Sequence, residues 1–305
     1  MRLYHVTGEE RYCKLANYFI NERGKNPHFF EEESRKRGWT HFGIDPKDTK
    51  YNQSYATVYE QKDAVGHAVR AVYMYTAMAD LAGSNGDDKL YEACLTLWKS
   101  IAERRMYLTA GIGSTGELEA FTVDYDLPND MVYAETCASI GLVMWAYRMF
   151  LIEPKAEYFD VIERALLNVN LAAVSLDGKK FFYENMLRRA KKLEYKLIWP
   201  LTRTEYLISY CCPPNLARMV TQSGEYAYTV SADSVYTGIY GECDAVLTLE
   251  NGASFTLKQK TEYPYNGKIV FEFENVSCDR PVTLNLRIPK WAEAGSIKVG
   301  AEERK

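Results

Sequence analysis

The sequence has 305 residues, of which 47% are hydrophobic and 26% are charged, so it is long enough for two globular domains with sizeable cores. Its formal net charge of −4 lacks the basic footprint of a nucleic-acid-binding protein. The N-terminus has no apolar signal core, the most apolar stretch (138–152) is short for a membrane span, and the seven cysteines favour a reducing compartment, so we expect a cytoplasmic protein without nucleic-acid or membrane partners.

The first part of the chain has the pattern of successive helices. Apolar residues recur there at helical spacing, and turns rich in Gly, Asn or Asp separate the segments. The predicted helices cover about 9–23, 63–82, 87–106, 138–151, 157–172 and the residues after Pro214. A polar, irregular connection over 24–54 and a glycine-rich stretch over 108–116 lie between them, and 181–183 resembles a strand.

From about Glu225 the pattern changes to short alternating runs, which is typical of a β-sandwich. The runs are 226–230, 245–249, 254–257, 268–273 and 282–288, with Asn-Gly turns at 251–252 and 266–267. We therefore expect helical hairpins over residues 1–224, followed by an all-β sandwich domain over residues 225–305.

Two adjacent cysteines, Cys211 and Cys212, are followed directly by Pro213 and Pro214. A residue before proline avoids the helical region, and proline suits the first position of a helix, so we expect a helix that begins at Pro214. A stiff corner of this kind suits a metal site or a reactive thiol. The alternatives are two small buried hydrophobic side chains or a strained bridge between neighbours.

Glu135 and Cys137 come just before the apolar segment that begins near Ala138. In extended backbone, residues two apart share a face, so this carboxylate and thiolate can reach one ion. Together with Cys211 and Cys212 they supply the four ligands of a tetrahedral zinc ion. The alternative is a buried cysteine beside a glutamate that complements the helix dipole.

Glu119 follows the glycine-rich stretch in an irregular segment with aromatic neighbours. It is a candidate proton donor, because an apolar setting raises the pKa of a carboxyl group, although a solvated acidic loop is the competing interpretation. His67 lies beside Gly66 on the helix predicted over 63–82, where a lone histidine is more often a core residue. The 24 tyrosines suit sugar binding, although we expect most of them simply to pack.

Several motifs occur together and in one order, and they carry a family resemblance. They are Glu60–Ala71, Glu119–Phe121, Tyr125–Asp130, Tyr133–Ser139, Val174–Gly178 and Cys211–Arg218. With them, the chain resembles the β-L-arabinofuranosidases of glycoside hydrolase family 127 from about residue 10 to residue 292.

The resemblance implies a fold, a cofactor and a reaction. The fold is a partial α/α six-hairpin barrel followed by a β-sandwich, and the cofactor is Zn²⁺ held by Glu135, Cys137, Cys211 and Cys212. The reaction is release of terminal L-arabinofuranose from β-L-arabinofuranosides with retention. Cys211 would be the nucleophile, Glu119 the general acid/base, and His67 a sugar contact.

The chain also departs from the family pattern. Ala110 replaces a usual glycine, and Tyr55 and Thr57 stand where His and Pro are expected, which leaves the glycoside open to another pentofuranoside or a hexoside. Family members are longer at both ends, so we expect a fragment that is unstable, aggregated or inactive alone. The alternative function is a non-catalytic carbohydrate-binding fragment that retains a structural zinc site.

Overall fold

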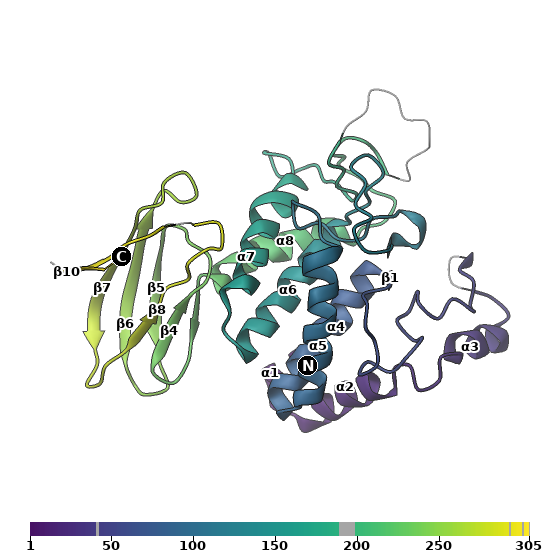
Figure 1. Cartoon of the computed structure of the whole chain (residues 1–305), viewed down its shortest axis with the longest axis horizontal. Helices are drawn as coiled ribbons and strands as arrows, with labels where there is room; N and C mark the ends of the chain where they lie inside the picture. Colours follow the sequence, from purple (N-terminus) through teal and green to yellow (C-terminus); the bar gives the residue numbers. More distant parts are fainter. Residues whose placement is uncertain (41–42, 189–198, 293, 301, 305) are drawn as a thin grey trace. The chain divides into compact units, whose positions relative to one another are not determined.

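A computed structural model describes residues 1–40, 43–188, 199–292, 294–300 and 302–304 (Figure 1). The chain divides into two compact units, which are Met1–Pro154 with Val161–Ala217 (unit 1) and Lys155–Asp160 with Arg218–Lys305 (unit 2). Unit 1 is mainly helical and unit 2 is mainly β structure, which confirms the predicted order of a helical domain and a β-rich domain. Within the described ranges, no helix combines the length and apolarity that crossing a bilayer requires.

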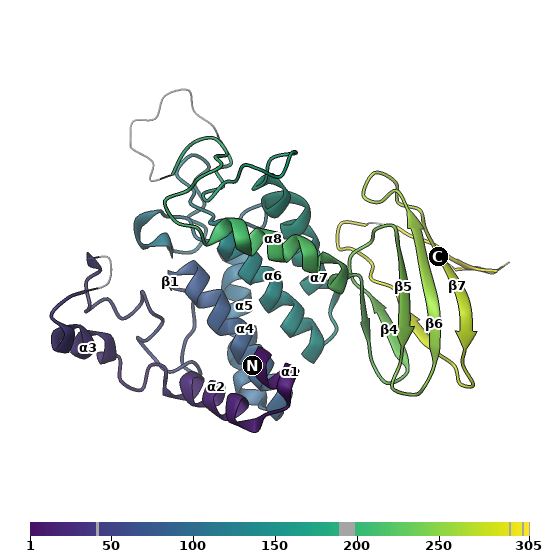
Figure 2. The same cartoon turned by 180° about the vertical axis from the view of Figure 1, so that it is seen from behind.

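The core of unit 1 is built from three helices, α4 (Ala68–Asn85), α5 (Asp88–Arg104) and α6 (Thr136–Ile152). They lie side by side, with α4 against both of the others (Figures 1 and 2). Helix α6 is buried on nearly every face because almost all of its residues are apolar or small. Helix α4 runs three residues past the predicted end at 82 and stops at Asn85, where Gly86 adopts the left-handed conformation that ends a helix.

The other helical segments lie outside this three-helix core. They are α1 (Arg2–Thr7), α2 (Glu10–Glu22), α3 (Phe29–Arg37), α7 (Ala156–Ala165), the π-helical turn η3 (Leu166–Asn170), α8 (Cys212–Gln222) and two short 3-10 turns, η2 (Glu117–Glu119) and η4 (Ser223–Tyr226). The sequence did not predict α1, which buries no residue, or α3, whose side chains are mostly charged. The connection predicted as irregular over 24–54 therefore contains a helix, and residues 41 and 42 of that connection lie outside the described residues.

Two predicted helix starts are wrong. Helix α4 begins at Ala68 rather than at residue 63, because Gly66 has a φ of 69° and interrupts the helical backbone. Helix α8 begins at Cys212 rather than at Pro214. The two prolines are tolerated in its first turn because the first amides of a helix have no intrahelical acceptor.

Unit 2 contains two three-stranded sheets and a terminal hairpin. One sheet has the order β3 (Tyr228–Val230), β4 (Ser234–Thr237), β8 (Thr283–Asn285), with β4 and β8 parallel, and the other is the antiparallel sheet β5 (Cys243–Thr248), β6 (Ser254–Thr261), β7 (Ile269–Ser277). The hairpin is β9 (Ile297–Val299) with β10 (Glu302–Arg304).

The core of unit 2 joins side chains from both sheets. Val235 of β4 packs in one apolar cluster with Phe255 and Leu257 of β6. Strand β4 was not predicted from the sequence. The strand-like segment at 181–183 in unit 1 makes only isolated bridges at Phe181, so the prediction of a strand there is wrong.

Candidate active site and metal centre

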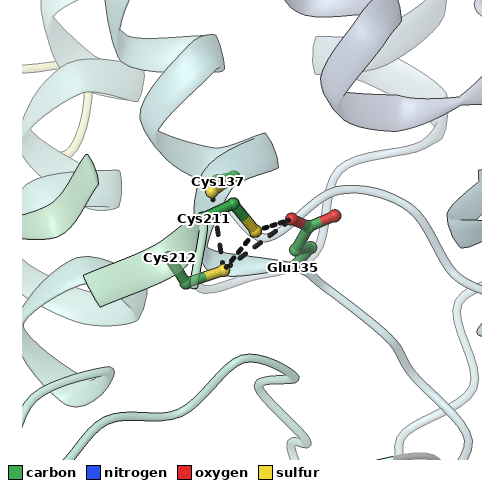
Figure 3. Close-up of side chains that lie close together, drawn as sticks. All are labelled: Glu135, Cys137, Cys211 and Cys212. Carbon is green, nitrogen blue, oxygen red and sulfur yellow. Dashed lines mark hydrogen bonds between the residues drawn. The ribbon is translucent and has the colours of Figure 1, made fainter. Parts of the chain in front are cut away.

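Four side chains from distant parts of unit 1 form a compact cluster. They are Glu135, Cys137, Cys211 and Cys212, and one ligand atom from each lies within 4.8 Å of the others (Figure 3). Glu135 is the N-cap of α6, with extended backbone, while Cys137 already lies in the first turn of that helix. The predicted extended approach therefore holds for Glu135 and is wrong for Cys137.

Four of the six distances between the donor atoms are close to those around a tetrahedral ion. Zinc bonds of about 2.3 Å to sulfur and about 2.0 Å to oxygen require edges of about 3.8 Å between sulfurs and about 3.5 Å between sulfur and oxygen. The Sγ atoms of Cys137 and Cys212 are 3.5 Å apart, and those of Cys211 and Cys212 are 3.7 Å apart. Glu135 Oε1 lies 3.5 Å from Cys211 Sγ and 3.7 Å from Cys212 Sγ.

The cluster has no positive charge of its own to balance its acids. Burial, followed by the nearby charge of Glu119, raises the pKa of Glu135 well above its usual value. Hydrogen bonds from Cys137 and Cys212 lower the pKa of the Cys211 thiol, whereas the pKa of each of those two neighbours is raised. Glu135 Oε2 is buried and has no hydrogen-bond partner among the described residues. This donor set therefore fits a divalent cation that accepts sulfur and oxygen.

A second carboxyl group, that of Glu119, lies beside the cluster and receives three hydrogen bonds. His67 Nε2 lies 2.7 Å from Glu119 Oε2, and the hydroxyl of Tyr133 donates to Oε1 at 2.6 Å. The hydroxyl of Tyr183 lies 3.3 Å from the same Oε1. Since the backbone amide of Arg70 donates to His67 Nδ1, the neutral imidazole carries its proton on Nε2 and donates it to Glu119.

These donors correct the expectation about the pKa of Glu119. Burial alone raises this pKa, but the hydrogen bonds from His67, Tyr133 and Tyr183 outweigh burial, and the pKa is lower than its usual value. The apolar surroundings inferred from the sequence are therefore the wrong description. The carboxyl group lies in a polar cradle that stabilises its ionised form.

The backbone that carries both carboxyl groups is strained. Leu118 and Glu119 have φ values of 57° and 54°, and Ala134, directly before Glu135, has a φ of 41°. Residues other than glycine avoid this region of φ, and the few that adopt it concentrate at functional sites. Ala110, at a position where family members usually have glycine, also has a positive φ of 63°, so the backbone there has the conformation that glycine favours.

His67 reaches Glu119 through a short antiparallel pair of strands. His67 of β1 (Gly66–His67) pairs with Ala120 of β2 (Ala120–Phe121), the residue that follows Glu119. The same His67 is the N-cap of α4, at the end of this helix away from α1 and α2 (Figure 2). The predicted position inside a helix is wrong, because Gly66 breaks the helix one residue earlier.

Gly66→Ala is expected to lower the free energy of unfolding by roughly 3 kcal/mol or more. A Cβ atom at Gly66 would lie 2.0 Å from the carbonyl oxygen of Lys50, so the backbone that presents His67 must move. Gly178→Ala is the matched control, since Gly178 has a similar φ of 71° with nothing within 4 Å of the added atom, and it should lose only about 1 kcal/mol. Denaturant melts of both variants measure the difference, and equal losses would contradict a steric role for Gly66.

Tyr55 and Thr57, the two other residues that depart from the family pattern, form hydrogen bonds within their own segment. Tyr55 donates its hydroxyl proton to the carbonyl of Asp63 at 3.3 Å, and the Thr57 hydroxyl donates to Glu60 at 2.7 Å. These bonds stabilise the loop that leads into β1.

Comparisons with known proteins agree along nearly the whole chain. Residues 1–225 match the family model for the β-L-arabinofuranosidase GH127 catalytic domain, and residues 234–305 match the model for the GH127 middle domain. The chain belongs to glycoside hydrolase family 127. The resemblance read from the motifs is thereby confirmed.

Relatives in family 127 are similar in sequence and in structure. A non-reducing end β-L-arabinofuranosidase of Bifidobacterium longum is 36% identical over 95% of this chain and 45% of its own length. The crystal structure of a GH127 β-L-arabinofuranosidase from Geobacillus stearothermophilus T6 superposes with a TM-score of 0.94 and 42% identity, over 99% of this chain and 48% of the other. A second GH127 β-arabinofuranosidase structure has a TM-score of 0.81 and 38% identity, over 95% of this chain and 41% of the other. The chain thus spans about half the length of these family 127 relatives.

Three aromatic residues of this family 127 site were not singled out from the sequence. Tyr133, Tyr183 and Trp199 form an apolar cluster with Cys137 and Cys212, and their polar atoms bond one another or Glu119. Tyr133 lies two residues before Glu135, so the motif itself contained a signal. Trp199 carried no such local signal.

A cavity of about 510 Å³ lies within unit 1. Phe182, Glu184 and Asn185 line it, so both neighbours of Tyr183 in the chain face this cavity. Its other walls are Thr109, Leu167, Asn168, Val169, Leu171, Ala172, Met186, Leu187, Pro200 and Leu201. Glu184 is only 8% exposed, and burial raises the pKa of its carboxyl group to about 7.

Glu184→Gln is expected to stabilise the chain at pH 8. The folded state keeps the proton of Glu184 up to about pH 7, whereas the unfolded chain loses it near the usual value of 4.5, so stability falls as pH rises between these values. Removing the charge should restore roughly 1–2 kcal/mol, since water in the cavity screens part of the cost. Thermal melts from pH 4 to pH 8 measure this, with exposed Glu205→Gln as the control. An unchanged slope in Glu184→Gln would disprove the assignment.

Proposed function

We propose that this chain carries the catalytic centre of a retaining glycosidase that releases terminal L-arabinofuranose from β-L-arabinofuranosides. The observation that carries the proposal is the position of the Tyr183 hydroxyl, which lies 3.2 Å from Cys211 Sγ and 3.3 Å from Glu119 Oε1. The named activities of the family 127 relatives support the choice of sugar. Residues 1–224 would form the catalytic domain and residues 225–305 the sandwich domain.

The geometry suits a nucleophile and an acid/base on one sugar. Because Cys211 Sγ and Glu119 Oε1 both contact the Tyr183 hydroxyl, their separation cannot exceed the sum of those two contact distances. Retaining glycosidases hold their two catalytic groups about 5–5.5 Å apart, which lies within this bound. Cys211 is the most exposed of the three cluster cysteines, as attack on a substrate requires.

The proposed reaction has two displacements. In the first, the Cys211 thiolate forms a bond to the anomeric carbon, the glycosidic C–O bond breaks, and protonated Glu119 gives its proton to the leaving oxygen. In the second, ionised Glu119 takes a proton from water, the water oxygen bonds to the anomeric carbon, and the C–S bond breaks to restore the thiolate. Two inversions give retention.

Glu135, Cys137, Cys211 and Cys212 are the residues that would hold Zn²⁺, which when bound stabilises thiolates over thiols at neutral pH. The hydrogen bonds of Glu119 favour its ionised form before substrate arrives, so the first displacement requires Glu119 to gain a proton when the sugar displaces water from the site. His67 borders Glu119 and is proposed to contact the sugar as well.

The test is release of L-arabinose from an aryl β-L-arabinofuranoside by the chain extended to the full length of its family 127 relatives, and the wild type is compared with Cys211→Ser and Glu119→Gln. Product configuration read by NMR before mutarotation should show the β anomer first. A carbohydrate-binding fragment with a structural metal would bind the sugar without any turnover, and a panel of other pentofuranosides and hexosides would expose a different specificity.

A further inference from the structure

We infer that Trp199 and Tyr133 are positioning residues that aim the Glu119 carboxyl group through a chain of two hydrogen bonds. This inference rests on the proposed function, since it assigns Glu119 the role of acid/base. Trp199 Nε1 donates to the Tyr133 hydroxyl oxygen at 2.7 Å, and that hydroxyl donates to Glu119 Oε1 at 2.6 Å. Both aromatic residues are buried, at 7% and 1% exposure.

The direction of this chain is fixed by chemistry. An indole N–H can only donate, so it occupies a lone pair of the Tyr133 oxygen and leaves the hydroxyl proton to be given elsewhere. The carboxylate of Glu119 is the acceptor at hydrogen-bond distance. Trp199 therefore determines which way the Tyr133 proton points, although its own polar atom bonds Tyr133 rather than the carboxyl group.

The same indole also positions the second tyrosine. The rings of Trp199 and Tyr183 stack with centroids 3.8 Å apart and planes 12° apart, and the Tyr183 hydroxyl lies 3.3 Å from Glu119 Oε1. One buried side chain thus holds both tyrosines that contact this oxygen. His67 holds the other carboxyl oxygen, so the plane of the carboxyl group is defined from both sides.

Glu119 needs this support because its own backbone does not provide it. Leu118 and Glu119 are consecutive residues with left-handed backbone, outside the main helices. The side chain of Glu119 is 29% exposed. A general acid must hold its proton in line with the leaving oxygen, and a misplacement of about 1 Å costs on the order of 100-fold in rate. The structure therefore assigns the positioning to the aromatic residues.

The test compares two substrates that differ in their need for an acid. A dinitrophenyl β-L-arabinofuranoside has a leaving group that departs without protonation, whereas an alkyl β-L-arabinofuranoside requires a proton from Glu119. Tyr133→Phe and Trp199→Phe should lower kcat/KM for the alkyl glycoside by about 10–100-fold, which is part of the usual contribution of general acid catalysis. The rate of the first displacement on the dinitrophenyl glycoside should change little. Metal content should stay at the wild-type value.

Tyr75→Phe and Trp145→Phe are matched controls, because their buried polar atoms have no partner within the described part of the chain. They should leave the ratio of the two kcat/KM values unchanged. Equal losses on both substrates, or no loss on either, would overturn the inference, while the absence of wild-type turnover on either substrate would count against the proposed function instead.

A crystal structure of Trp199→Phe provides a readout without turnover. The Glu119 carboxyl group should leave its place between His67 and Tyr133, or occupy it only in part. A carboxyl group that stays in place with full occupancy would overturn the inference, whatever the activity.

Discussion

Cys211→Ser is expected to lower kcat/KM for an aryl β-L-arabinofuranoside by on the order of 10⁴-fold or more. A serine hydroxyl stays protonated at neutral pH, whereas hydrogen bonds from Cys137 and Cys212 already favour the thiolate of Cys211. The substitution is nearly isosteric, so the thermal melt should change far less than the activity. Turnover is measured by release of the aryl group, and the fold by circular dichroism.

Cys278→Ser is the control for this change, because Cys278 is a half-buried free cysteine of unit 2 whose thiol donates to the Arg280 carbonyl. Cys278→Ser should leave turnover unchanged.

Glu119→Gln should lower kcat/KM by about 10²–10⁴-fold for a glycoside with a poor leaving group. For a glycoside with an activated leaving group, added azide should restore part of the rate, because azide can replace water as the second nucleophile without a general base. Residual turnover near the wild-type rate in Cys211→Ser would exclude Cys211 as the nucleophile.

Chelation of the proposed metal is expected to abolish turnover and to lower the stability of unit 1. Glu135 and the three thiols are crowded together, and a bound cation would offset the cost of burying them in their ionised forms. At a metal concentration about 1,000 times its Kd, the bound form gains about 4 kcal/mol. For a domain of this size that corresponds to roughly 10 °C in melting temperature.

Metal analysis, calorimetric melts and turnover before and after chelation test this expectation, and added Zn²⁺ should restore all three readings. Cys137→Ser should bind the metal more weakly, while Cys243→Ser in unit 2 should bind it as the wild type does. A chain that melts at the same temperature with and without the metal, and retains its turnover after chelation, would remove zinc from the proposal.

The sequence was sufficient to group the four side chains of the candidate metal site. Residue types suggested Glu135, Cys137, Cys211 and Cys212, the family resemblance implied them as one site, and the structure brings their donor atoms within 4.8 Å. The division into a helical part and a β part was also predictable, since the change in hydrophobic period near residue 225 directly reflects side-chain burial.

Other features could not be read from local pattern. The hydrogen bond between Trp199 and Tyr133 joins residues 66 positions apart, so no periodicity reports it. The pKa of Glu119 depends on His67 and Tyr183, which are distant in the chain and act against burial. Positive φ at Glu119 is likewise held by the surrounding packing, because glutamate by itself avoids that conformation.

The left-handed backbone at Leu118, Glu119 and Ala134 has a consequence for anyone who wishes to transplant this centre into a designed scaffold. Copying the side chains onto regular helices or strands would aim both carboxyl groups in the wrong directions, because ideal elements do not visit that region of φ. A successful graft has to import the loops themselves, together with the aromatic residues that hold the Glu119 carboxyl group.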